Sequence, residues 1–194
     1  MKSVRCFIAI EFSAEIKQKL SELKDRLAES VSTGAVRWVK PANIHLTLKF
    51  LGDTEIAKLD LVGDQLEELA AVHAPLVIQL DKLGCFPNHR KPRVVWVGVN
   101  GGSTLQDIQR AVEDNLAPLG WPVESRKYHP HLTLGRVKNP QQVVTARYPW
   151  GKQLVTGHQR ANEICLIVSD LQPSGPVYTV RRRVRLGGES PESP

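Results

Sequence analysis

Hydrophobic positions along the chain follow two periods, one typical of strands and one typical of helices. Residues 4–12 are rich in β-branched and aromatic side chains and predict a strand. Ser13 is then a candidate N-cap, after which apolar residues recur every three or four positions. This stripe predicts an amphipathic helix that ends near Ser30, and it comprises Ile16, Leu20, Leu23 and Leu27.

Strand and helix signals continue to alternate as far as residue 186. Further strands are predicted at 36–39, 44–51, 75–83, 94–99, 131–137, 165–168 and 178–186. Further helices are predicted after residue 54 and from Ser103, where Gln106 completes a capping box, whereas residues 140–148 are turn-rich and ambiguous. Many antiparallel-style strands with few helices predict an α+β fold.

The domain organisation follows from the same pattern. No long linker separates two independent units, so we expect one bilobal domain over residues 1–187. Residues 188–194 consist of Gly, Ser, Glu and Pro and contain no core-forming side chain, which predicts a flexible C-terminal tail.

Composition narrows the class of protein. Hydrophobic residues make up 41% and charged residues 24% of the 194 positions, which is typical of a globular chain. No apolar run reaches the ~18 residues of a membrane span, and the opening apolar stretch is too short for a signal peptide. Cys6, Cys85 and Cys165 form no Cys-x-x-Cys pair, which argues against a disulfide framework or a thiolate zinc site. We therefore expect a cytoplasmic protein.

The charge balance is the one compositional hint about a partner. Lys and Arg number 26 against 20 Asp and Glu, for a formal net charge of +6. Such an excess attracts phosphates, but it also serves simply to keep a small protein soluble.

One tetrapeptide occurs twice, as His45-Leu46-Thr47-Leu48 and as His131-Leu132-Thr133-Leu134. Each copy lies in a predicted strand that follows a proline-containing turn. Strand periodicity places the histidine and the threonine on one face and the two leucines on the other. A lobe duplicated about a pseudo-twofold axis would bring both polar faces to one cleft.

Two histidines and two threonines in one cleft suit phosphate chemistry. Imidazole titrates near neutrality, so a neutral ring can accept a proton while a protonated ring donates one. Threonine hydroxyls can donate to anionic phosphate oxygens. Together they can cleave a cyclic phosphodiester without a metal.

Three other interpretations compete with this one. A single histidine in a strand is more often structural than catalytic, although the repeat in matched contexts favours catalysis. His45, His131 and His129 could supply nitrogens to a metal, but no carboxylate lies at a ligand-like spacing beside either motif. No Gly-x-Ser-x-Gly motif supports a serine nucleophile.

Paired His-x-Thr-x motifs are the signature of the two-histidine phosphoesterase superfamily. Over residues 5–186 the chain resembles its RNA 2′,3′-cyclic phosphodiesterase (2′-5′ RNA ligase) family. The resemblance is carried by both motifs with their flanks and by segments 5–10, 38–41, 86–87, 92–98 and 169–178.

The resemblance implies a bilobal α+β fold with two antiparallel sheets, flanking helices and an active site between the lobes. It implies hydrolysis of RNA 2′,3′-cyclic phosphate ends to 2′-phosphomonoesters, without a cofactor or metal, and reversible 2′-5′ ligation. By the family pattern His45 is the proton donor, His131 is the proton acceptor, and Thr47 and Thr133 bind phosphate. The residues alone leave open which histidine is acid and which is base, because the motifs are nearly symmetric.

Three further residues are candidates for contact with RNA. Arg136 lies five positions after His131, where Phe50 follows His45, and the resemblance places an RNA-contacting arginine there. Its strand parity is opposite to that of His131, so the strand must bend near Gly135. Tyr128 and Phe7 are candidate base-stacking platforms, with core packing the stronger expectation for Phe7.

Three arginines near the C-terminus, Arg181, Arg183 and Arg185, share one face of a predicted strand. They would form an RNA surface or protect an edge strand from pairing, and the sequence favours neither role.

The resulting hypothesis is a monomeric, metal-independent RNA cyclic phosphodiesterase with no membrane association and no obligate protein partner. Two alternatives remain open, namely an RNA-binding module of the same fold without physiological hydrolysis, and a phosphodiesterase for another small cyclic nucleotide.

Overall fold

Strands and helices alternate along the chain in an α+β arrangement, as the sequence predicts. The computed structural model describes residues 2–173 and 175–188, so all but the first residue of the predicted tail lies outside the described residues. The strands are β1 (Ser3–Glu11), β2 (Val36–Trp38), β3 (His45–Glu55), β4 (Leu76–Phe86), β5 (Val94–Asn100), β6 (His131–Val137), β7 (His158–Ala161), β8 (Glu163–Gln172) and β9 (Gly175–Arg185). The α-helices are α1 (Ala14–Ala28), α2 (Leu59–Ala71), α3 (Gly102–Leu116) and α4 (Pro140–Thr145), and the short 3₁₀ helices are η1 (Pro41–Asn43), η2 (Ile56–Lys58) and η3 (Ala117–Leu119).

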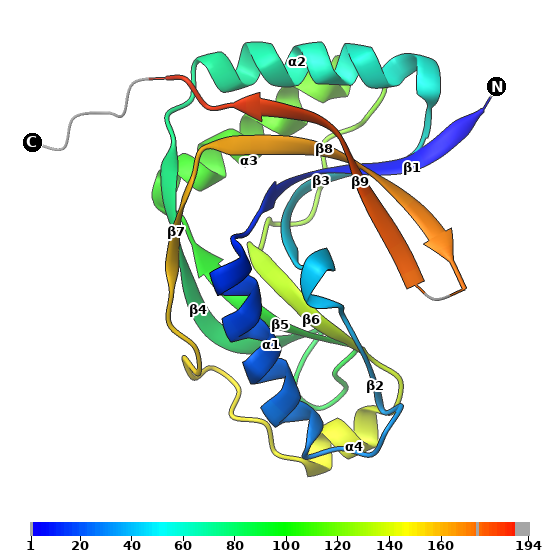
Figure 1. The fold of residues 1–194 in the computed structure, drawn as a ribbon, viewed down its shortest axis with the longest axis vertical. Coiled ribbons are helices and arrows are strands. Elements are labelled where there is room, and N and C mark those ends of the chain that lie inside the picture. Colours follow the sequence, from blue (N-terminus) through cyan, green and yellow to red (C-terminus); the bar gives the residue numbers. More distant parts are fainter. Residues whose placement is uncertain (1, 174, 189–194) are drawn as a thin grey trace, which may run out of the picture.

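The strands form one curled antiparallel sheet (Figure 1). Their order is β7-β4-β5-β6-β3-β1-β8-β9, with β2 paired to β6. The inner strands β6 and β3 each begin one half of the sheet, with β2 added to the half of β6, and the halves join where Leu46 pairs with Leu132. The two predicted antiparallel sheets are therefore continuous through this pairing.

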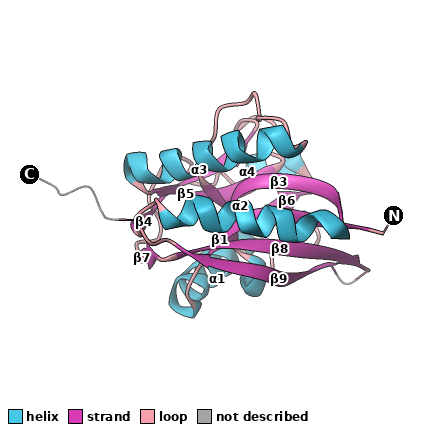
Figure 2. Ribbon diagram, turned by 90° about the horizontal axis from the view of Figure 1, so that it is seen from above, coloured by secondary structure: helices cyan, strands magenta, loops and turns pink. Residues whose placement is uncertain are grey.

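Helices α1 and α3 each pack on the half of the sheet that does not contain the strand before them. Helix α1 follows β1, yet its Ile16 packs over Gly157, whose carbonyl accepts the backbone N–H of Leu80 in β4 of the other half. Helix α3 follows β5, yet it lies beside α2 and against β3 (Figure 2). Each half is thus covered by a helix whose preceding strand belongs to the other half.

The predicted stripe of α1 is confirmed, because all four of its apolar residues are buried and Ser13 caps the helix by accepting the N–H of Ile16. The capping box predicted at Ser103 is wrong. Helix α3 begins at Gly102 with no side-chain cap, and the Asn100 side chain accepts the Gly102 N–H at 3.0 Å instead. Among the described residues, no helix combines the length and apolar character needed to cross a membrane.

A buried ion pair links β3 to α3. The residues Lys49 and Glu113 are only 6% and 5% exposed, and their side chains form a salt bridge. The Lys49 ammonium also donates to the Pro122 carbonyl at 2.8 Å, and the Glu113 carboxylate accepts the backbone N–H of Glu124 at 3.1 Å. The pair therefore anchors the irregular segment that leads into β6.

We expect Lys49→Met to lower the free energy of unfolding by about 3–5 kcal/mol, because it leaves the Glu113 carboxylate buried without a partner. Guanidinium denaturation followed by circular dichroism measures this. Lys19→Ala, which breaks the exposed pair with Glu15, should cost at most about 1 kcal/mol. Equal losses for the two variants would contradict the role of the buried pair, and Lys49→Met with Glu113→Leu should recover most of the stability.

Candidate active site

The two His-x-Thr motifs lie side by side as antiparallel strand segments. Leu46 and Leu132 pair across β3 and β6, and both side chains are fully buried. Because side chains alternate along a strand, the histidine and threonine that flank each leucine project to the opposite face. This face lines a groove of about 540 Å³, to which His45, Thr47, His131 and Thr133 all contribute.

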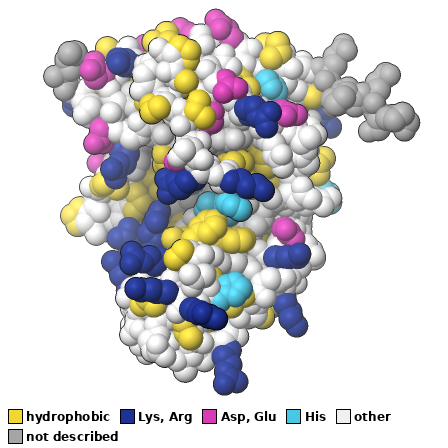
Figure 3. Space-filling view, turned by 180° about the vertical axis from the view of Figure 1, so that it is seen from behind, with side chains coloured by type: hydrophobic (Ala, Val, Ile, Leu, Met, Phe, Trp, Pro, Cys, Tyr) yellow, Lys and Arg dark blue, Asp and Glu magenta, His cyan; other side chains and the backbone are white. Residues whose placement is uncertain are grey.

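The remaining walls of the groove come from several parts of the chain. They are β2 with the segment that follows it, the end of β4 with the start of β5, the segment before β6, residues 173 and 175–178 of the β8–β9 hairpin, and one later residue in each of β3 and β6. Their lining residues are Arg37, Trp38, Val39, Lys40, Asn43, Phe50, Phe86, Val94, Arg126, Arg136, Pro173, Gly175, Pro176 and Tyr178. Figure 3 shows that lysine and arginine side chains gather around and below a hollow on this side of the molecule, whereas most acidic side chains lie nearer the top.

Each histidine ring is oriented by a hydrogen bond to the backbone carbonyl two residues before it. His45 Nδ1 lies 2.8 Å from the carbonyl oxygen of Asn43, and His131 Nδ1 lies 2.6 Å from that of His129. A carbonyl oxygen only accepts hydrogen bonds, so each Nδ1 carries the hydrogen and donates it. In each ring Nε2 is left as the nitrogen available for proton transfer.

Aromatic side chains enclose both imidazoles. Phe7 stacks on His45 with the centroids 4.6 Å apart, and Tyr178 meets the same ring edge-on at 5.3 Å. His131 is packed edge-on against Phe86 at 5.0 Å. These contacts remove water from one side of each ring.

Burial among these aromatic groups disfavours the charged form of each histidine. Desolvation lowers the pKa of His45 to about 4, although the hydrogen bond to Asn43 opposes this shift. Desolvation also lowers the pKa of His131. The hydrogen bond to the His129 carbonyl opposes this shift, whereas electrostatic repulsion from the His129 ring and from Arg136 adds to it. Both shifts favour the neutral ring, and a phosphate anion between the rings would raise the pKa of either one.

A matched β-bulge follows each motif. Thr133 pairs with Trp96 but Gly135 pairs with Val95, so Leu134 is an extra residue in β6. In the same way Thr47 pairs with Ala9 but Lys49 pairs with Ile8, so Leu48 is an extra residue in β3.

The bulges turn the fifth residue after each histidine into the groove. Arg136 and Phe50 both line it, and the Phe50 residue is 71% exposed. The bend that the sequence requires near Gly135 is thus confirmed. A Cβ at Gly135 would lie 2.6 Å from Val36 and 2.8 Å from the ring of Trp38, which explains the glycine.

Phe7 and Tyr128 do not line the groove, so the geometry does not meet the prediction that they are base-stacking platforms. Phe7 is 3% exposed because it packs behind His45, in line with the core role that the sequence favoured. Tyr128 is partly buried, desolvation raises its pKa, and its hydroxyl donates to the Thr47 carbonyl at 3.0 Å. Phe7 therefore contacts a side chain of β3, and Tyr128 contacts the backbone of the same strand.

Several residues that line the groove were not predicted from the sequence. Arg37, Lys40 and Asn43 precede the first motif, and of these three only Lys40 lies in a segment, residues 38–41, that resembles the family. Tyr178 reaches His45 from β9, far away in the chain. Within residues 2–173 and 175–188, no three His, Cys, Asp or Glu side chains are grouped to hold a metal ion.

The arginines of β9 contact carboxylates. Arg181 pairs with Asp60 of α2 and Arg183 pairs with Glu11 of β1. Arg185 lies near Glu163 in the neighbouring strand. This face of β9 is thus tied to the fold by ion pairs.

Comparison with known proteins gives a consistent result. The family model described as LigT-like phosphoesterase matches residues 10–96 and again residues 97–178. An RNA 2′,3′-cyclic phosphodiesterase of Methanothermobacter thermautotrophicus is 35% identical over 94% of this chain and 99% of the relative. One of Aquifex aeolicus is 33% identical over 97% of this chain and all of the relative.

Solved structures resemble the whole fold. A Thermus thermophilus protein superposes with a TM-score of 0.80 at 28% identity, covering 96% of this chain and all of that protein. Escherichia coli LigT in complex with NADP+ gives a TM-score of 0.71 at 26% identity over 96% of this chain and 99% of LigT.

We expect His45 to titrate near pH 4, and His131 to titrate below the ordinary value of 6.5, because burial weakens proton binding by both rings. Proton NMR of the ring Cε1–H groups measures both values, with His45→Gln and His131→Gln as assignment controls. Adding inorganic phosphate should raise both pKa values. A folded-state pKa below the unfolded value also means that stability falls as the pH drops from about 6.5 towards 4. Ordinary titration of both rings near 6.5 would contradict their desolvation.

Proposed function

The chain belongs to the LigT-like phosphoesterase family, and from this premise we propose that it hydrolyses RNA 2′,3′-cyclic phosphate ends to 2′-phosphomonoesters. The observation that carries the proposal is the antiparallel pairing of the two His-x-Thr motifs. It brings two imidazoles with free Nε2 atoms, and two threonine hydroxyls, to one groove. The names of the curated relatives support RNA as the substrate.

In the proposed reaction the two histidines divide the proton transfers. Nε2 of His131 removes a proton from water as the water oxygen bonds to phosphorus. The bond between phosphorus and O3′ breaks, and Nε2 of His45 protonates the departing O3′. The phosphate stays on O2′, His131 gains one proton and His45 loses one. The product is a 2′-phosphomonoester.

His45 must be protonated before it can donate, although burial lowers its pKa to about 4. Two features favour the imidazolium once substrate binds. The anionic phosphate stabilises the positive ring, and the Asn43 carbonyl accepts the Nδ1–H bond that the cation strengthens. The assignment of His45 as acid and His131 as base follows the family pattern.

Thr47 and Thr133 would donate to the non-bridging phosphate oxygens, which carry the charge that develops during the reaction. Arg136 would compensate the same charge from the end of β6. If an RNA 5′-hydroxyl took the place of water, the same groups would form a 2′-5′ linkage, and we include this ligation as a minor reaction.

We expect His45→Ala and His131→Ala each to lower kcat by about 10²–10⁴-fold, because each removes one proton-transfer group. The substrate is an RNA oligonucleotide with a 2′,3′-cyclic phosphate end, and phosphorus NMR identifies the position of the product phosphate. His158→Ala, at an exposed position of β7, is the matched control. A 3′,5′-cyclic nucleotide tested in parallel should not be cleaved. Retention of turnover in both motif variants would refute the two-histidine mechanism.

We expect the activity to persist in excess EDTA, because two imidazoles supply both proton transfers. The measurement is the initial rate on the same oligonucleotide before and after chelation. Loss of the rate in EDTA with recovery on adding Zn²⁺ would overturn metal-independent catalysis.

A further inference from the structure

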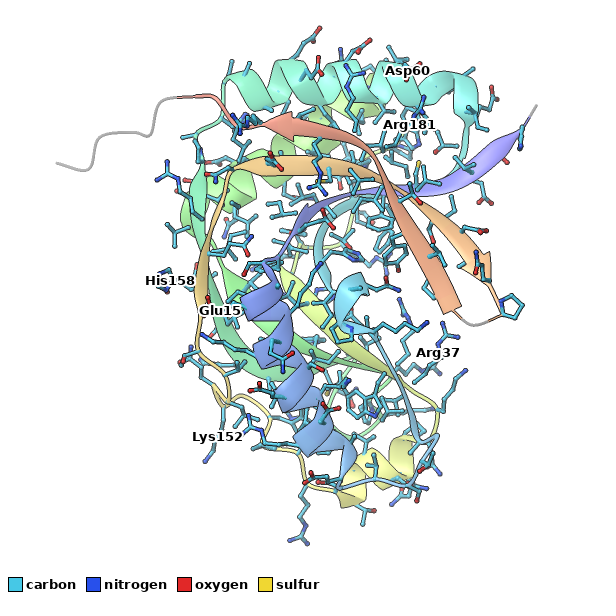
Figure 4. The ribbon with its side chains drawn as sticks, viewed as in Figure 1. Glu15, Arg37, Asp60, Lys152, His158 and Arg181 are labelled. Atoms are coloured by element: carbon cyan, nitrogen blue, oxygen red, sulfur yellow. The ribbon has the colours of Figure 1, made fainter. Side chains whose placement is uncertain are left out.

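Two arginines lie next to each other at one wall of the groove. Arg37 of β2 pairs in register with Arg136 of β6, and both line the groove together with the two motif histidines. Arg37 lies on β2 below the free end of the β8–β9 hairpin (Figure 4). Neither arginine belongs to the two repeated His-Leu-Thr-Leu tetrapeptides, residues 45–48 and 131–134.

These two guanidinium groups have no carboxylate partner within the described parts of the chain, unlike the arginines of β9. Arg181 lies 3.4 Å from Asp60, beside α2 (Figure 4), and Arg182 pairs with both Asp64 and Glu67. Among the described residues that line the groove there are four cationic side chains and no carboxylate. The cationic residues are Arg37, Lys40, Arg126 and Arg136, of which Arg126 forms a salt bridge with Glu124 outside the groove lining.

The positive charge of this wall exceeds what one cyclic phosphate needs. A cyclic phosphodiester carries a single negative charge at neutral pH, and the proposed site already provides Thr47, Thr133 and Arg136 to bind it. Two adjacent guanidinium groups repel each other unless an anion lies between or beside them. A second phosphate would relieve this repulsion and accept hydrogen bonds from Arg37.

Arg37 lies one strand away from the strand that carries Arg136 and the second motif. Arg136 belongs to β6, which also carries His131 and Thr133, whereas Arg37 belongs to β2, which carries neither motif. Neighbouring strands are separated by ~4.8 Å, so Arg37 lies beside Arg136 and is set off by one strand from the residues of the second motif.

We propose that Arg37 binds the phosphodiester immediately 5′ of the terminal nucleotide, so that the groove selects an RNA end over a cyclic mononucleotide. This inference rests on the proposed function, because it takes the terminal cyclic phosphate to lie between His45 and His131. Arg37 is thus a specificity-determining residue, and the ligand that it recognises is the charge of the adjacent internucleotide linkage.

The experiment compares kcat/KM for a dinucleotide ending in a 2′,3′-cyclic phosphate with kcat/KM for the corresponding cyclic mononucleotide. The wild-type protein should prefer the dinucleotide by about 10-fold or more, the value of one charge-assisted hydrogen bond. Arg37→Gln should remove most of this preference. Replacing the internucleotide phosphate by an uncharged methylphosphonate should have the same effect in the wild-type protein and little further effect in Arg37→Gln.

Two further variants distinguish a local contact between Arg37 and the internucleotide phosphate from a general attraction of RNA by the positive charge of the protein. Arg181→Gln removes one positive charge at a distance from the groove and should leave the preference unchanged. Arg136→Gln should lower kcat/KM for both substrates, because Arg136 lies beside the terminal phosphate site. The salt dependence of binding should also fall by ~0.7 in log–log slope for Arg37→Gln with the dinucleotide.

Binding measured by calorimetry decides the proposal independently of turnover. The probes are a dinucleotide and a mononucleotide that each carry a terminal 3′-phosphate. Selective weakening of dinucleotide binding by Arg37→Gln supports the proposal, and equal weakening of both probes overturns it. If the wild-type protein cleaves neither cyclic substrate, the proposed hydrolysis fails, while this binding comparison still tests the role of Arg37.

Discussion

The pairing of Leu46 with Leu132 is the contact on which the site depends. It joins the two halves of the sheet at one point, and both leucines are fully buried in the core that the halves share. Because the strands run antiparallel about this point, His45 and His131 lie on opposite sides of the leucine pair. The hydrophobic burial that joins the halves is therefore the same interaction that brings the two imidazoles to one groove.

The approximate twofold symmetry of the two motifs extends to the bulge that follows each threonine, but the residues that the two bulges present differ. A bulge follows each threonine at the same position, and each bulge turns the fifth residue after the histidine into the groove. In one half that residue is the exposed aromatic Phe50, and in the other it is Arg136. One backbone device thus presents an apolar surface on one side and a cation on the other, which gives a symmetric fold an asymmetric binding surface.

The charged side chains form two groups, those that form ion pairs within the fold and those that line the groove. The β9 arginines are neutralised by carboxylates of neighbouring elements, and Lys49 with Glu113 forms a buried pair that anchors the segment leading to the second motif. Arg37 and Arg136 have no such partner within the described residues and face the groove. Surrounding aromatic groups desolvate His45 and His131, so a phosphate bound between the two rings, as proposed, would raise the pKa of either ring.

The sequence by itself determined the α+β class, the parity of His45 and Thr47 within a strand, and the need for a bend at Gly135, because these follow from local periodicity and backbone sterics. Residue roles within the site came from family resemblance and remain proposals. Only the tertiary structure decided that Phe7 lies behind His45, that Tyr128 holds the Thr47 carbonyl, and that Arg37 lies beside Arg136. These facts depend on contacts between segments far apart in the chain, and on burial, which no local pattern encodes.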